Sequence, residues 1–133
     1  MTNVWLKDIL EQLKWQSKNS AYQALRGTLH ALRDRLPTEE AIQLAAQLPL
    51  PIKGVYFDGW TPRDKPEKYN KEEFARRVHE QFQLDPDLNP AEIIRAVLRV
   101  MYRHMGEGEL RDVRSNMPKG IQEWFPEEIR QEQ

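Results

Sequence analysis

Residues 20–37 read SAYQALRGTLHALRDRLP, and residues 89–106 read NPAEIIRAVLRVMYRHMG. In the first stretch leucines recur every three or four positions, from Leu25 to Leu36, and Pro37 follows directly. This spacing puts the leucines on one face of an α-helix, and a proline ends such a helix. Shifted by 69 positions, the second stretch has apolar residues at the same places. A pair of matching amphipathic helices therefore decides the predicted fold.

The match between the two stretches extends outward in both directions without a gap. Paired positions include Trp5/Phe74, Ile9/Val78, Leu44/Val113, Pro49/Pro118 and Tyr56/Phe125. Identities are few, but the agreement of apolar positions indicates that both halves bury the same face. The sequence predicts an all-α protein of two tandem copies of a roughly four-helix unit, over 2–60 and 71–129, with the polar, proline-interrupted linker 61–70 between them. We expect the copies to pack around a pseudo-two-fold axis as one compact bundle, a single domain over 1–133.

The start and stop signals give bounds for each helix. In the first unit we expect a helix capped by Asn3, one capped by Ser20 and ending at Pro37, one from Thr38 to about Gln47, and one from Pro49 to Gly59. In the second unit we expect helices near 71–83, 90–105, 109–116 and 118–125, with Asn89 as a cap.

Composition excludes several classes of function. The 133 residues are 31% charged with a net charge of −1, so there is no overall electrostatic attraction to nucleic acid or anionic membrane. The absence of cysteine excludes thiol catalysis and fits a reducing compartment. We see neither a signal peptide nor an apolar run long enough to span a membrane, so we expect a cytoplasmic location and no membrane partner. The oligomeric state is not predicted.

No catalytic residue, metal site or cofactor is predicted. His30, His79 and His104 lie on different predicted helices, without the spacing that lets two imidazoles hold one metal ion. Glu40 and Glu109 occupy the same place in both units, where first-turn interaction with the helix dipole is the simplest explanation.

The strongest polar signal is a stripe of three arginines. Arg95, Arg99 and Arg103 are spaced four apart on one helix face, where like charges repel by about 0.2–0.5 kcal/mol per pair. Two interpretations stay open. Acidic residues elsewhere in the fold, such as Glu39 or Glu40 across the pseudo-two-fold axis, could compensate the stripe, or an external anion or acidic partner could bind it.

Trp60 is a further candidate for partner binding. It follows Phe57-Asp58-Gly59, where the fourth helix should end, and it precedes the linker. One interpretation is that Trp60 packs the linker onto the first unit. The other is that it is an exposed anchor of the kind enriched at interface hot spots.

Several motifs together resemble a known family. They are Leu25–Leu36, Ala45–Pro49, Gly54–Trp60, and Gly108–Val113 with Met117-Pro118. This ordered set is similar to the bacterial family catalogued as domain of unknown function 2267, over about residues 5–125. The resemblance implies a small bacterial helical protein and implies no activity. One departure is Gly27, where alanine is expected; a glycine there costs about 1 kcal/mol of helix stability and would permit a close helix contact.

The sequence therefore predicts a non-enzymatic helical protein-interaction or scaffold module, with an unknown protein as its partner. The alternative is an enzyme or small-ligand binder with a pocket between the repeats. A weak nucleic-acid binder comes third. It requires the arginine stripe to join Lys71, Arg76 and Arg77 on one continuous basic face.

Overall fold

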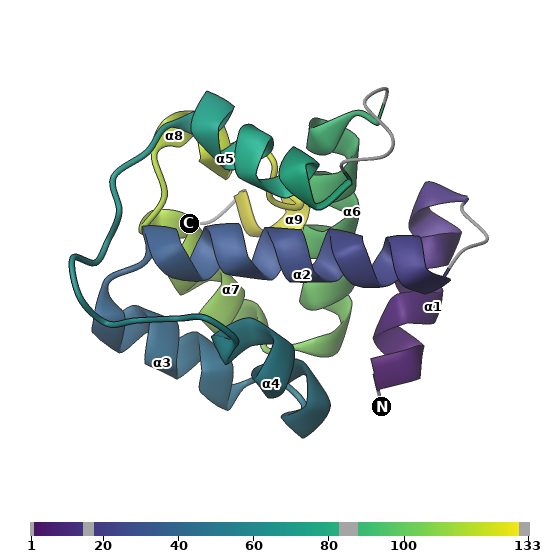
Figure 1. The fold of residues 1–133 in the computed structure, drawn as a ribbon, viewed down its shortest axis with the longest axis horizontal. Coiled ribbons are helices and arrows are strands. Elements are labelled where there is room, and N and C mark those ends of the chain that lie inside the picture. The colour runs from purple at the N-terminus through teal and green to yellow at the C-terminus, as the bar shows by residue number, and fades with distance from the viewer. Residues whose placement is uncertain (1, 15–17, 83–87, 131–133) are drawn as a thin grey trace.

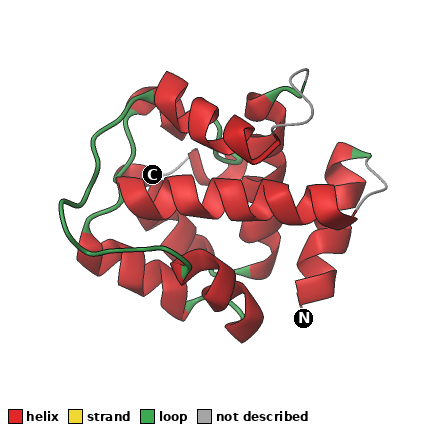
Figure 2. Ribbon diagram, viewed as in Figure 1, coloured by secondary structure: helices red, strands yellow, loops and turns green. Residues whose placement is uncertain are grey.

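All regular structure in the described part of the chain is helical. The computed structural model describes residues 2–14, 18–82 and 88–130, and Figure 2 shows helices and loops but no strand among them. The predicted all-α class is therefore confirmed.

The helices follow one another through short connections (Figure 1). Their bounds are α1 Thr2–Leu13, α2 Lys18–Arg35, α3 Thr38–Ala46, α4 Leu50–Phe57, α5 Lys71–His79, the 3₁₀ helix η1 Glu80–Phe82, α6 Pro90–His104, α7 Glu107–Ser115, α8 Lys119–Gln122 and α9 Glu127–Arg130.

Some predicted bounds were wrong. Asn3 and Ser20 lie inside helices rather than at caps, because α1 begins at Thr2 and α2 at Lys18. Helix α7 begins at Glu107 with Gly106 as its cap, two residues earlier than expected. Helix α9 was not predicted. Its four residues are too few to show a helical period, and Ile129 within it is fully buried.

Other helix starts agree with the signals in the sequence. The Asn89 side chain accepts a hydrogen bond of 3.0 Å from the backbone N–H of Ala91, as a cap before Pro90 should. Pro49 and Pro118 stand directly before α4 and α8. Because proline has no N–H to donate, a helix start is a position that tolerates it.

Helix α2 crosses the middle of the molecule, with α5 along one side and α3 and α4 along the other (Figure 1). Helix α1 packs against α2 and α6, while α5 packs against α2 and α6 in turn. Helix α3 packs against α7. The two predicted units therefore share their core, although the internal duplication itself stays a prediction.

The two halves approach each other closely at Gly27 of α2. A Cβ atom there would lie 2.8 Å from Cγ of Gln81 and 3.4 Å from Cα of Val78. A side chain at this position would force Gln81 to move. Gly27 therefore permits a close contact between the helices, as expected from the sequence.

The segment 61–70 forms a strap that passes from α4 round the C-terminal end of α2 to α5, seen at the left of Figure 1. The side chain of Lys65 is only 4% exposed, and its Nζ lies 2.9 Å from Glu67 and 3.8 Å from Asp34. The backbone N–H of Glu67 donates to the carbonyl of Asp34 at 2.8 Å, and the Tyr69 hydroxyl donates to the carbonyl of Ala31. The predicted linker is thus fastened to α2 by polar contacts.

Among the helices that the structure describes, none has the length and apolar character needed to cross a bilayer.

Candidate functional site

Helix α6 carries the three arginines on the side away from the core. Its other face is buried, through residues that include Ile94, Val97 and Met101. The apolar period of about 3.6 residues fixes this orientation, so a spacing of four keeps Arg95, Arg99 and Arg103 on the outer face.

Arg99 is compensated inside the molecule, but by a residue that the sequence did not suggest. Its Nη1 lies 2.8 Å from Oε2 of Glu128 on α9, and its guanidinium lies 5.8 Å from the ring centre of Tyr102. Within the described residues no ion pair joins the stripe to Glu39 or Glu40, so that predicted pairing was wrong. Both side chains of the Arg99–Glu128 pair are partly exposed, which makes its contribution to stability small.

Arg103 reaches across to α1. With the amide of Gln12 turned so that both groups are satisfied, Nη2 of Arg103 lies 3.1 Å from the Gln12 side-chain oxygen. This contact binds α1 to α6 without neutralising the arginine's charge.

Arg95 differs from the other two arginines. It is exposed, and no ion pair or hydrogen bond joins its guanidinium to any residue of the described ranges. It lines a groove of about 390 Å³ between the end of α1, the outer face of α6 and the segment 123–127. We call this the arginine groove.

The arginine groove has a mixed lining. Leu13 and Ala96 contribute apolar surface, and Trp124 and Phe125 lie beside them, almost fully buried. Three carboxylates, of Glu92, Glu123 and Glu127, line it together with Arg95 and Arg99. The groove therefore offers a small apolar surface beside the guanidinium of Arg95, unpaired within the described residues, with the carboxylates of Glu92, Glu123 and Glu127 close by.

Trp60 does not line the arginine groove. Its indole is half-buried against the core, with its ring centre 5.4 Å from that of Phe57. Its Nε1 is buried and has no acceptor among the described residues. The packing therefore favours Trp60 as a residue packed on the core at the end of α4, rather than as an exposed anchor, and its packing of the linker onto the first unit stays a prediction.

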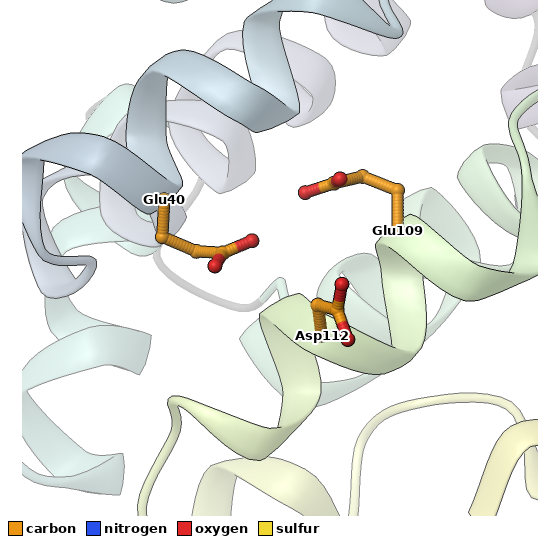
Figure 3. A group of neighbouring side chains, drawn as sticks. All are labelled: Glu40, Glu109 and Asp112. Carbon is orange, nitrogen blue, oxygen red and sulfur yellow. The ribbon is translucent and has the colours of Figure 1, made fainter.

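A second group of polar side chains meets between α3 and α7. Glu40 projects from α3, while Glu109 and Asp112 project from α7 toward it (Figure 3). Each offers a carboxylate oxygen, and these oxygens lie within 4.8 Å of one another. We call these three residues the carboxyl cluster.

Within the carboxyl cluster, Glu109 binds a proton more tightly than an ordinary glutamate does. Burial raises the pKa of the Glu109 carboxyl to about 7, helped by its hydrogen bond to Glu40 and by the negative charges of Glu40 and Asp112. Oε2 of Glu40 and Oε2 of Glu109 are both buried without a hydrogen-bond partner among the described residues. Near neutral pH, Glu109 is therefore protonated for part of the time.

Sequence reasoning explained Glu40 and Glu109 by the helix dipole and missed their contact. Both glutamates do lie in the first turn of their helices, as that explanation requires. The available signal was their match in the predicted repeat, because equivalent residues near a two-fold axis face each other. The donor set is all oxygen, as hard divalent cations prefer, but three neighbouring carboxylates do not by themselves assign a metal.

Comparison with known proteins places these features in a family. A family model with the description "Uncharacterized conserved protein (DUF2267)" matches residues 2–124. No curated protein matches the chain. The matched range contains the stripe and the carboxyl cluster, whereas α9 with Glu128 lies beyond it.

Proposed function

The chain belongs to the DUF2267 family, whose description assigns no activity, and from this premise we propose that it is a non-enzymatic module that binds an acidic segment of a protein partner in the arginine groove. One observation carries the proposal. Arg95 presents an exposed guanidinium with no partner in the described residues, beside a groove that has a small apolar surface. Arginine beside apolar surface, here that of Leu13, is typical of interface hot spots.

The groove's carboxylates favour a protein segment over a nucleic acid. A phosphate backbone seated on Arg95 would also meet Glu92 and Glu127. Repulsion from these carboxylates would oppose the attraction on which nucleic-acid binding depends. A protein segment can place a single acidic side chain on Arg95 and keep its other charges away.

The larger basic face that a nucleic-acid binder needs has little support. Arg76 is paired with Glu73 and Glu80, and Arg77 with Glu67 and Glu73. These pairs neutralise arginines that would have to extend the stripe. With a net charge of −1, no other attraction replaces them.

The volume of the arginine groove limits how much of a partner can bind in it. A volume of about 390 Å³ accommodates a few side chains, at the lower end of ligand pockets. We expect a short acidic segment to bind there with modest affinity and strong salt dependence, because the principal contact is an exposed ion pair. The cysteine-free composition supports the cytoplasm as the place of this binding.

The alternative function, a small-ligand binder or enzyme between the predicted repeats, has narrower support. The carboxyl cluster does lie between α3 and α7, and its titration is perturbed as at many functional sites. Ion-pair networks and buried clusters that only stabilise a fold perturb pKa values as well.

The test is affinity purification from native lysate with three baits: the wild type, Arg95→Glu, and Arg63→Glu as a matched exposed control. The captured protein's acidic segment, made as a synthetic peptide, is then titrated into each bait beside the same peptide with Gln for Glu and Asn for Asp. Binding that requires both Arg95 and the peptide's acids, and that survives Arg63→Glu, supports the proposal. Recovery of nucleic acid, or of the same protein with Arg95→Glu, contradicts it.

A further inference from the structure

We propose that Glu40 and Glu109 form a proton-dependent clasp between α3 and α7. The clasp is closed while the two carboxyl groups share a proton, and it weakens when both are ionised. This inference concerns the carboxyl cluster and does not depend on the function proposed for the arginine groove.

Glu40 and Glu109 can act as a clasp because they lie on two different helices that pack together, α3 and α7. Helix α3 packs against α7, and each helix has a buried side, which includes Leu44 on α3 and Leu110 on α7. The Tyr56 hydroxyl donates a hydrogen bond of 2.8 Å to the carbonyl of Ala41, which ties α3 to α4. Because α3 is joined to α4, a change in the α3–α7 contact should affect the position of both α3 and α4.

The chemistry of the pair gives it two states. With one proton present, the protonated carboxyl donates an O–H hydrogen bond to the other group, which carries the single negative charge. When that proton leaves for solvent, two carboxylates face each other with Asp112 beside them. Like charges at this distance in a partly buried site repel strongly, and no O–H donor remains between them.

The charges that act on Glu109 are all negative. From α3 it faces Glu40, and on its own helix it faces Asp112. Tyr56 of α4 is the nearby phenol, and its hydroxyl is already committed to Ala41. None of these groups supplies a positive charge to hold a second carboxylate.

The charged groups on α7 and on the neighbouring helices do not offset the raised pKa of Glu109. On α7 itself, Arg111 is paired with Glu107 at 2.7 Å, and Arg114 adds a second guanidinium. Helix α8 contributes the exposed Lys119. On α6, His104 is paired with Asp8, and Arg99 is paired with Glu128 of α9, where Glu127 is exposed.

The raised pKa of Glu109, about 7, places the switch in the neutral range. A proton held this tightly in the closed state and released on opening makes opening about tenfold easier at pH 8 than at pH 6. An ordinary exposed glutamate is ionised at both pH values and produces no such change.

The experiment follows both the proton and the clasp in the whole chain. Carbon-13 NMR of the glutamate side-chain carboxyls, from pH 3 to 9, reports the titration of Glu109 and Glu40. Amide hydrogen exchange at pH 6, 7 and 8, corrected for intrinsic exchange rates, reports opening of α3 and α7 relative to α1 in the same molecule. We expect a carboxyl that titrates near neutrality and a loss of about tenfold in protection of α3 and α7 between pH 6 and pH 8.

Two variants separate the clasp from general effects of pH. Glu109→Gln keeps a hydrogen-bond donor toward Glu40 but cannot ionise, so its protection in α3 should not change between pH 6 and pH 8. Glu39→Gln, an exposed neighbour of Glu40 in the same turn, should behave like the wild type. Equal pH dependence in wild type and Glu109→Gln would overturn the proposal, as would titration of both carboxyls near their ordinary pKa.

A third arm distinguishes a proton from a cation. The same measurements are made with EDTA and then with added magnesium chloride. If the clasp is protonic, the pH dependence persists in EDTA. If removal of divalent ions abolishes it, the cluster acts through a metal and the proposal is wrong. Should Glu109→Gln fail to fold, the wild-type titration and exchange data still decide the question.

Discussion

The guanidinium of Arg33, near the end of α2, donates a hydrogen bond of 2.6 Å to the carbonyl oxygen of Tyr56 in the last turn of α4. The same Nη1 donates to the carbonyl of Asp58 at 2.7 Å, and Nε lies 3.0 Å from Asp34. Carbonyls in the last turn of a helix have no partner within that helix. A buried arginine on α2 therefore completes the end of α4 and sets its place on the fold.

Replacing Arg33 with methionine is expected to destabilise the protein by about 2–4 kcal/mol, because carbonyls at the end of α4 lose a buried donor. Asp34 keeps Lys65 nearby, which limits the loss. Urea denaturation measures the change. Arg63→Met, at an exposed position in the strap, should change the free energy of unfolding by less than about 0.5 kcal/mol. Equal effects of the two substitutions would mean that the Arg33 hydrogen bonds contribute nothing.

Two glycines give a matched test of helix packing. Gly27→Ala puts a Cβ atom 2.8 Å from Cγ of Gln81, so we expect a net loss of about 1–2 kcal/mol even though alanine favours the helix. Gly54→Ala in α4 meets nothing within 4 Å, so it should stabilise the protein by about 0.5–1 kcal/mol. Urea denaturation of both variants gives the comparison, and stabilisation by Gly27→Ala would contradict the tight contact.

Local patterns predicted the long helices well and the polar partners poorly. The leucine period of α2 and the Asn89–Pro90 start of α6 are written in neighbouring residues, so the sequence shows them directly. The pairing of Arg99 with Glu128 joins residues 29 positions apart through a four-residue helix that has no period to detect. Likewise, nothing local in the polar segment 61–70 indicates that Lys65 would be buried. Such contacts depend on the packed arrangement of whole helices.

Burial of Ile129 rather than the Arg99–Glu128 pair should hold α9 in place. Ile129 is fully buried, so Ile129→Ala is expected to cost about 2–4 kcal/mol. Glu128→Ala removes an ion pair between partly exposed groups and should cost less than about 1 kcal/mol. Thermal and urea unfolding of the two variants show which substitution costs more stability. If the ion pair were the main attachment of α9, Glu128→Ala would cost more than Ile129→Ala.

The carboxyl cluster predicts an unusual dependence of stability on pH. The pKa of Glu109 is raised to about 7 in the folded protein, so between pH 4.5 and 7 the folded state binds more protons than the unfolded state. Stability from this group is therefore fully present below pH 4.5 and is lost as pH rises through 7. Allowing for partial exposure, we expect Glu109→Gln to be more stable than the wild type by about 1 kcal/mol at pH 8.

Carboxylates elsewhere in the molecule act in a separate pH range. The arginines beside Glu73 lower its pKa to about 2, and the pKa values of Glu67 and Glu128 are lowered as well. Their contributions are present above pH 4.5 and are lost at lower pH. Urea midpoints of wild type and Glu109→Gln between pH 5 and pH 9 isolate the cluster. Parallel curves over this range would contradict the raised pKa.

The shared core predicts how the halves behave apart. Helix α1 packs against α6, and α5 packs against α2, so residues 1–60 or 71–129 alone expose apolar faces that the other half covers. Neither fragment should unfold cooperatively as a monomer.

If the halves are copies of one unit, two molecules of residues 1–60 can cover each other as the two halves do in the intact chain. Cooperative unfolding of that fragment should then appear only at concentrations where light scattering detects a dimer. A monomeric fragment with a sharp transition would show that the halves are independent domains, and a fragment that stays unfolded at every concentration would argue against equivalent copies.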